Sequence, residues 1–152
     1  MSSLQIKQRL HSLCLRNIEE RINTAEQAIA FAQSSANEET KSSAGDKYET
    51  GRAMAQLEIE KNSAQLLDAK KLKQQLLQLD PNKVTDKIQL GSLVITNQGN
   101  FYISIPSGKF TVDDEVYFAI SPSSPIAQNL IGLKFGDKFS FNKKEFTIDS
   151  FI

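Results

Sequence analysis

The chain is poor in the residues that build metal, redox and disulfide sites. It has one cysteine, Cys14, and one histidine, His11, among its 152 residues. A single cysteine excludes an intrachain disulfide, and the pair leaves no cluster for a structural zinc ion. Both residues fall on or beside the apolar face of a predicted helix, where a lone cysteine usually behaves as a small hydrophobe. We therefore interpret both as core residues.

The chain also lacks a net charge and a long apolar run. Its 18 Lys and Arg residues balance 18 Asp and Glu residues, which argues weakly against general nucleic-acid binding, because that usually needs a basic excess. No run approaches the roughly 18 apolar residues of a membrane span, and the N-terminus has no apolar core of a signal peptide. We expect a cytoplasmic protein that does not enter a membrane.

Proline is absent before Pro81, and glycine is rare there, whereas Ala, Leu, Gln, Glu and Lys are abundant. After Pro81 the composition turns to Phe, Ile, Val, Gly, Ser and Pro. This shift predicts an α+β chain in three parts. We expect an antiparallel helical hairpin over residues 1–80, a linker over 81–87, and a small antiparallel β domain with one short helix over 88–152.

Two heptad patterns predict the arms of the hairpin. The first helix should run from about Leu4 to Ser34 and the second from about Asp46 to Leu79. Small or apolar residues recur along both at spacings of mainly three and four, as in a coiled-coil seam. They are Leu15, Ile18, Ile22, Ala25, Ile29 and Ala32 in the first helix, and Ala55, Ile59, Leu66 and Ala69 in the second. Asn62 also occupies a seam position, which predicts a role in setting the register.

A polar interruption between the helices carries four acids. We place the tip of the hairpin at about residues 36–48, and the four acids in and directly beside it are Glu38, Glu39, Asp46 and Glu49. One interpretation is that Ser or Asp residues cap the second helix and that its positive end favours acids. The other is that repelling carboxylates on a narrow tip complete a Mg²⁺ site on another molecule. These residues alone leave both interpretations open.

After Pro81, apolar and polar residues alternate as they do in the strands of a small sheet. Phe139 alternates with Phe141, and Phe146 with Ile148, so that all four should line one face. Strands are expected over residues 92–96, 101–105, 116–120, 138–141 and 145–151.

Residues typical of turns and helix caps lie between these expected strands. The turn Asn97–Asn100 predicts that the first two strands form a hairpin. Ser123 or Ser124 can cap a short helix that has Pro125 in its first position and ends at Gly132.

Residues 124–137, Ser-Pro-Ile-Ala-Gln-Asn-Leu-Ile-Gly-Leu-Lys-Phe-Gly-Asp, closely resemble the C-terminal signature of the Gre transcript cleavage factors. In that family a Ser-Pro pair begins a short helix, an apolar pair and a glycine close it, and a Gly-Asp turn leads into a terminal hairpin. Ile88 to Val94 looks like the family's first strand. The order of a long coiled-coil hairpin, a linker and an FKBP-like domain also matches, so the architectural resemblance covers the whole chain.

This resemblance implies a partner and a mechanism. In the family the C-terminal domain docks at the secondary channel of bacterial RNA polymerase, and the coiled coil enters the channel. Acidic tip residues then help to hold a second Mg²⁺ in the polymerase active site, and the polymerase hydrolyses its own backtracked RNA, as in two-metal catalysis. The chain would be a monomeric accessory factor rather than an enzyme, with no cofactor of its own and only indirect contact with the nascent RNA 3′ end. The expected polymerase contacts are Ser124, Pro125, Ile126, Gly136 and Asp137.

The tip departs from the family pattern of a Gly-acid pair, another acid about three residues on, and then Asn-Ala-acid-Tyr. An alignment on Gly45-Asp46 makes Asp46 and Glu49 the acids that share Mg²⁺ with the polymerase, with Glu38 and Glu39 as reserves. Residues 50–53, Thr-Gly-Arg-Ala, replace the Asn-Ala-acid-Tyr step. An alignment on Tyr48 would instead leave the second acid missing. This difference from the family pattern affects the expected cleavage activity more than the expected polymerase binding.

Three alternatives stand beside this interpretation. One is a secondary-channel regulator of the same shape that does not stimulate cleavage. Another is a structural coiled coil that dimerises, which the small seam residues and the central turn disfavour. The third is an FKBP-like prolyl isomerase, which needs an open aromatic pocket, whereas we expect most of the aromatic residues of this domain to be core. These aromatic residues are Phe101, Tyr102, Phe110, Tyr117, Phe118 and Phe135.

Overall fold

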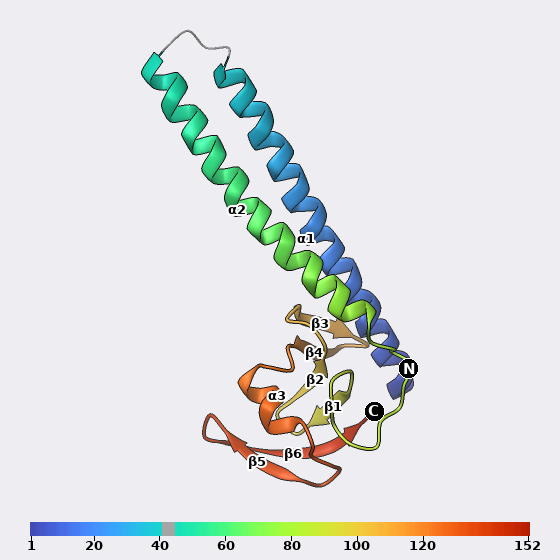
Figure 1. The fold of residues 1–152 in the computed structure, drawn as a ribbon. Helices are drawn as coiled ribbons and strands as arrows, with labels where there is room; N and C mark the ends of the chain where they lie inside the picture. Colours follow the sequence, from blue (N-terminus) through green and yellow to red (C-terminus); the bar gives the residue numbers. More distant parts are fainter. Residues whose placement is uncertain (41–44) are drawn as a thin grey trace. The chain divides into compact units, whose positions relative to one another are not determined.

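The structure is a computed structural model that describes residues 1–40 and 45–152, with the side chains of residues 39–49 outside the description. The α+β class is confirmed (Figure 1). The helices are α1 (Ser3–Thr40), α2 (Gly45–Leu77) and α3 (Pro125–Leu130). The strands are β1 (Leu93–Thr96), β2 (Gly99–Ile103), β3 (Gly108–Val112), β4 (Glu115–Ile120), β5 (Lys138–Phe141) and β6 (Lys144–Phe151).

The chain divides into two compact units, but not at the predicted linker. One unit comprises residues 1–17 and 74–152, and the other comprises residues 18–73. The first turns of α1 and the last turns of α2 therefore belong with the sheet. These helix ends belong with the sheet because their residues Leu10, Cys14 and Leu76 are fully buried.

The unit of residues 18–73 is an antiparallel pair of helices (Figure 1). Its buried residues follow the predicted seam, and between them lie half-buried Ile and Leu residues of the same seam. Alanine dominates this seam because a small side chain lets two helix backbones approach closely. The buried seam residues are Ile18, Ala25, Ala32, Ala55 and Ala69.

Both helices are longer toward the hairpin tip than the sequence predicts. The helix α1 ends at Thr40 instead of Ser34, and α2 begins at Gly45 instead of Asp46. Residues 35–40 and Gly45 are therefore helical beyond the predicted bounds, because Ala36, Glu38 and Glu39 sustain the first helix where its apolar pattern fades. At the other end α2 stops at Leu77 rather than Leu79.

Asn62 does not act as the register pin that its seam position predicts. Its side-chain amide donates to the main-chain oxygen of Glu58 at 2.8 Å and to the Glu58 carboxylate at 3.5 Å. Both acceptors lie four residues earlier on the same helix. Such a bond satisfies a half-buried amide locally and does not distinguish one pairing of the helices from another.

The sheet has six strands in the order β3-β4-β2-β1-β6-β5, and its pairs are antiparallel except for β2 with β4. The hairpin of β1 and β2 pairs Val94 with Phe101 and Thr96 with Gly99, which confirms the predicted turn. The sequence did not predict β3. This edge strand exposes Gly108, Lys109 and Thr111, so it lacks the apolar alternation of a strand with one covered face.

The core of this unit lies between α3 and the sheet. Phe139 and Phe141 pack against the buried Phe146 and Ile148, and the rings of Phe139 and Phe146 stack with centroids 4.9 Å apart. The predicted common face of these four residues is thus confirmed. The buried members of the core are Ile88, Val94, Phe101, Ile103, Ala127, Leu130, Phe146 and Ile148.

Truncation of Leu130 tests this core. We expect Leu130→Ala to lower the free energy of unfolding by about 2–5 kcal/mol, because Leu130 is fully buried and its removal leaves a cavity. Phe135→Ala is the matched control, because Phe135 is 74% exposed and its loss should cost less than about 0.5 kcal/mol. Chemical denaturation measures both values, and equal losses would contradict the assignment of the core.

Candidate functional site

The acids of the predicted tip lie at the facing ends of the two long helices. Glu38 is exposed in the last turns of α1, whereas Asp46 and Glu49 belong to the beginning of α2. The side chains of Glu39, Asp46 and Glu49 lie outside the described residues. Within the described part of the chain, no group of three or more His, Cys, Asp or Glu residues is placed to hold a metal ion. The proposed sharing of Mg²⁺ with a polymerase therefore stays a prediction.

The Ser-Pro motif forms the start of α3 as the sequence predicts. Ser124 is the N-cap, with φ −66° and ψ 150°, and Pro125 follows at the first helical position. The Ser124 hydroxyl accepts a hydrogen bond from the Ala127 N–H at 3.4 Å and donates to the main-chain oxygen of Ser121 at 2.7 Å. One hydroxyl thus satisfies a free helix donor and fixes the loop before the helix. Ile126 packs against the core.

The Gly-Asp motif forms a turn before β5. Gly136 has φ +85°, a conformation that favours glycine. The Asp137 carboxylate accepts a hydrogen bond from the Lys134 N–H at 2.9 Å. The main chain then joins β6, because the Gly136 N–H donates to the Ile148 oxygen and the Ile148 N–H donates to the Asp137 oxygen, both at 2.9 Å. The expected polymerase-contact residues Gly136 and Asp137 thus have a local structural role of their own.

Two exposed apolar side chains lie between these motifs. Ile131 follows directly after α3, and Phe135 precedes the Gly-Asp turn. Sequence reasoning placed Phe135 among core candidates, but the structure leaves 74% of it exposed. Its position next to a turn glycine, outside any alternating strand, is the signal that distinguishes it from the core aromatics. The segment from Ser121 to Asp137 therefore combines a rigid turn, a capped helix and exposed apolar groups, which suits a protein contact.

A polar stripe on α1, formed by the buried Lys7 and the half-buried His11 and Asn17, contacts other segments of the sheet-containing unit. Lys7 is 1% exposed, and its ammonium group donates to the main-chain oxygens of Lys83 at 2.7 Å and Ile152 at 3.1 Å. One turn later the His11 Nδ1 lies 2.8 Å from the Tyr102 hydroxyl. Further along, the Asn17 Oδ1 accepts a hydrogen bond from the Ser107 hydroxyl at 2.9 Å. The stripe anchors the start of α1 through partnered polar groups, as burial of such groups requires.

Burial shifts the pKa values of this stripe toward the neutral forms. Burial lowers the pKa of Lys7 and of His11, and the negative charge of Asp80 opposes both shifts. Burial also raises the pKa of the Cys14 thiol to about 11. A thiol with that pKa carries almost no thiolate near neutral pH, so Cys14 is chemically inert there. These directions agree with the interpretation of Cys14 and His11 as core residues.

One hollow of this unit is lined by uncharged residues, some polar and some apolar. It has a volume of about 410 Å³, and its lining includes Gln75, Gln78, Ser121 and Ser104. The buried Ser104 hydroxyl makes no hydrogen bond within the usual limits, although it lies close enough to the Cys14 thiol to influence its pKa.

The aromatic residues of this unit do not gather around such a hollow. Phe101, Tyr102 and Tyr117 are buried in the core, as expected, whereas Phe118 is partly exposed. The hollow at Ser104 has no aromatic residue in its lining. This hollow therefore does not provide the open aromatic pocket that a prolyl isomerase needs.

Comparisons with known proteins do not establish a family. No protein-family model matches the chain, and no curated protein matches it significantly. Among solved structures, the chain is similar to one described as "Structure of the transcription factor Gfh1", with 19% sequence identity and a TM-score of 0.33. The match covers 90% of this chain and 93% of that chain. In the part of the chain that the structure describes, no helix is long and apolar enough to cross a membrane.

Removal of the α3 cap tests the local role of Ser124. We expect Ser124→Ala to lower the free energy of unfolding by about 1 kcal/mol, because the Ala127 N–H loses its acceptor. Ser123→Ala is the control, because the exposed Ser123 hydroxyl contacts only the Ser121 hydroxyl, and its loss should cost less than about 0.5 kcal/mol. Both values come from denaturant titrations, and a Ser124→Ala variant as stable as the control would argue against the cap.

The half-buried imidazole predicts a pH dependence of stability. The pKa of His11 is lower in the folded protein, so the protonated form favours unfolding. The contribution of His11 is complete above the unfolded pKa of about 6.5 and is lost as the pH falls from that value through the folded pKa. Below about pH 6.5 the wild-type free energy of unfolding should thus fall more steeply than that of His11→Gln. Parallel curves in denaturation at stepped pH would contradict this role.

Proposed function

We propose that this chain is a Gre-like transcription factor that binds bacterial RNA polymerase and inserts its helical hairpin into the secondary channel. The observation that carries the proposal is the conformation of residues 124–137. They form a Ser-capped, Pro-started helix and a Gly-Asp turn that leads into a terminal hairpin. The same chain contains a long antiparallel helical hairpin. This combination agrees in motif and in element order with the pattern of the Gre factors.

In the proposed mechanism the chain supplies carboxylates and the polymerase supplies the chemistry. Asp46 and Glu49 would supply carboxylate oxygens that help to hold a second Mg²⁺ in the polymerase active site, where the metal would help to place a water molecule. With two metal ions both the attacking and the leaving oxygen are stabilised during hydrolysis of backtracked RNA.

The docking surface in this proposal is the segment from Ser121 to Asp137. The hydrogen bonds of Ser124 and Asp137 hold its backbone in place, so Pro125 and the exposed Phe135 are presented without a large ordering cost on binding. The chain has no catalytic centre of its own in this scheme, and its contact with the RNA 3′ end is indirect.

A second candidate is a secondary-channel regulator that blocks or modulates the polymerase without stimulating cleavage. The observation that favours it is the sequence of the tip, where Thr-Gly-Arg-Ala at residues 50–53 replaces the Asn-Ala-acid-Tyr step. Polymerase binding would then depend on the same docking surface, while the acids of the tip would have a different role.

A backtracked elongation complex with 3′-labelled RNA distinguishes the two candidates. We expect the wild-type chain to stimulate Mg²⁺-dependent release of short 3′ fragments. We expect Asp46→Ala with Glu49→Ala to lower that rate at least roughly 10- to 100-fold, because loss of even the outer-shell groups of a metal site typically costs that much. The matched control is Glu26→Ala with Glu60→Ala, which removes two exposed acids of the same hairpin away from the tip.

The outcomes separate binding from cleavage. Fragment release that is lost only in the tip variant supports the cleavage factor. No release by any variant, with unchanged competition for the secondary channel, supports the regulator instead. A wild-type chain that neither binds the polymerase nor releases fragments would overturn both candidates.

A further inference from the structure

The hollow that Ser104 lines lies at the carboxyl ends of two parallel strands. The strands β2 and β4 end at Ile103 and Ile120, which pair with each other, and the Ser104 N–H donates to the Ile120 oxygen at 2.8 Å. Ser104 and Ser121, the first residues after these strands, both line the hollow. In open α/β sheets, ligands bind outside the carboxyl ends of parallel strands. The hollow has the same position relative to the parallel pair of this sheet.

The Ser104 hydroxyl is a buried polar group without a hydrogen-bond partner. Ser104 is 2% exposed, and its Oγ atom makes no hydrogen bond with any residue that the structure describes. The Cys14 thiol is close enough to interact with it, but a thiol is a weak donor and a weak acceptor. Because an unsatisfied buried hydroxyl costs free energy, an occupant of the hollow that bonds to Ser104 would be favoured.

Two carboxamide side chains of the lining are also available. Gln75 lies in the last turn of α2 and Gln78 follows directly after the helix, and both line the hollow. Among the described residues, neither side-chain amide has a hydrogen-bond partner. Each amide offers an oxygen acceptor and two N–H donors. Leu79 and Leu90 add apolar surface to the same lining.

The absence of charge in this lining restricts the ligand. Of the residues that the structure describes, none with a charged side chain lines the hollow. A phosphate or a carboxylate would therefore lose water there without gaining a counter-charge. An uncharged group fits better, since small-molecule sites of about 300–1,000 Å³ combine apolar walls with a few polar groups, and this hollow has a volume of about 410 Å³.

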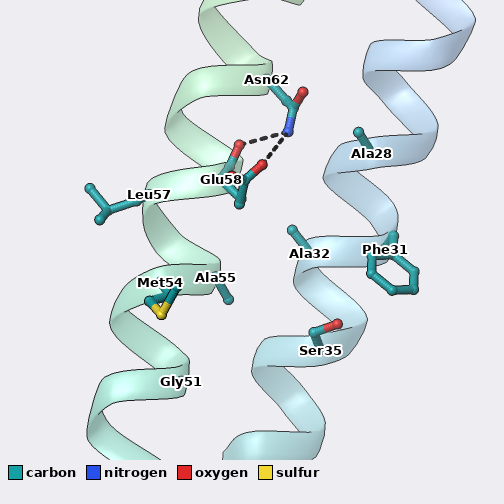
Figure 2. A pocket seen from close by; sticks show the side chains of 10 residues that line it. All are labelled: Ala28, Phe31, Ala32, Ser35, Gly51, Met54, Ala55, Leu57, Glu58 and Asn62. Atoms are coloured by element: carbon teal, nitrogen blue, oxygen red, sulfur yellow. Dashed lines mark hydrogen bonds between the residues drawn. The ribbon is translucent and has the colours of Figure 1, made fainter.

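The apolar groove between α1 and α2 offers no comparable polar partner. It is lined by Phe31 and Met54, among others, and its polar residues Glu58 and Asn62 hydrogen-bond to each other (Figure 2). Among the described residues of that groove, no buried side-chain nitrogen or oxygen lacks a partner. A hydrogen-bonding ligand is thus selected at Ser104 and not at the groove.

We propose that the hollow at Ser104 binds a small uncharged ligand with a hydrogen-bond donor next to an acceptor, as in a carboxamide or a nucleobase. The ligand satisfies the Ser104 hydroxyl, and its adjacent donor and acceptor pair with a glutamine carboxamide, as Gln pairs with adenine. Its apolar part contacts Leu79 and Leu90. The inference goes beyond the proposed function and does not rest on it, because the isolated chain binds this ligand.

Titration of the ¹⁵N-labelled full chain with N-acetylleucinamide and, separately, with adenosine tests the inference and distinguishes the two sources. We expect at least one of them to shift the amide resonances of Ser104, Ser121 and Ser123, with a dissociation constant below about 5 mM. N-acetylleucine differs from N-acetylleucinamide by a carboxylate in place of the amide. It should bind at least about tenfold more weakly than the amide, because the lining has no counter-charge.

Variants of the lining locate the site. Ser104→Ala, and Gln75→Ala together with Gln78→Ala, should each weaken binding of the better probe about fivefold, as expected for the loss of one hydrogen bond. Gln74→Ala is the matched control, since Gln74 is exposed on the same helix but outside the lining, and it should change binding less than about twofold.

Thermal unfolding of the free protein separates lost binding from lost folding. Ser104→Ala should not lower the midpoint of unfolding, because it removes a buried hydroxyl that has no partner.

Binding of N-acetylleucinamide alone supports the inference with a carboxamide as the source, and binding of adenosine alone supports it with a nucleobase. No shift with either probe at about 10 mM overturns the inference and leaves the hollow to water. Binding that is unchanged in both lining variants also overturns it, and so does equal binding of N-acetylleucine and its amide.

Discussion

A pair of helices has only one internal face, and this constraint governs the hairpin of residues 18–73. Among the described residues of that unit there are only two helices, so burial within it comes from the single seam between them. The seam is narrow because alanine occupies most of its buried positions, so the helices come close but remove little apolar area from water. An apolar groove lined by Phe31 and Met54, among others, follows from the same constraint. Two helices bury the seam between them but cannot also cover the side chains that flank the seam.

In the sheet-containing unit, polar contacts hold the start of α1 in place. Desolvation of Lys7, His11 and Asn17 costs free energy, and hydrogen bonds to specific partners in distant segments offset that cost. The Lys7 ammonium group is buried against the main-chain oxygens of residues 83 and 152, so a rotation of the helix that moved it away would leave a buried charge without partners. We interpret this stripe as a source of specificity at a cost in stability.

The proposed activity uses two regions in different parts of the chain. The segment 121–137 is held by its own hydrogen bonds, and the acids belong to the end of α1 and the beginning of α2. An accessory factor needs this kind of separation, because docking and delivery of ligands act on different regions of its target. The fold alone does not assign that role, so the tip sequence carries the distinction between cleavage and regulation.

The sequence by itself determined the features that depend on local chemistry. Heptad spacing gave the seam from Ile18 to Ala69, and the Ser124-Pro125 pair gave the capped start of α3, because periodicity and capping involve residues only a few positions apart. Tertiary contacts decided the pairing of β2 with β4, the edge strand β3, the exposure of Phe31 and the partner of His11. Each of these depends on which distant residues cover a side chain or a strand edge, and no local pattern encodes that.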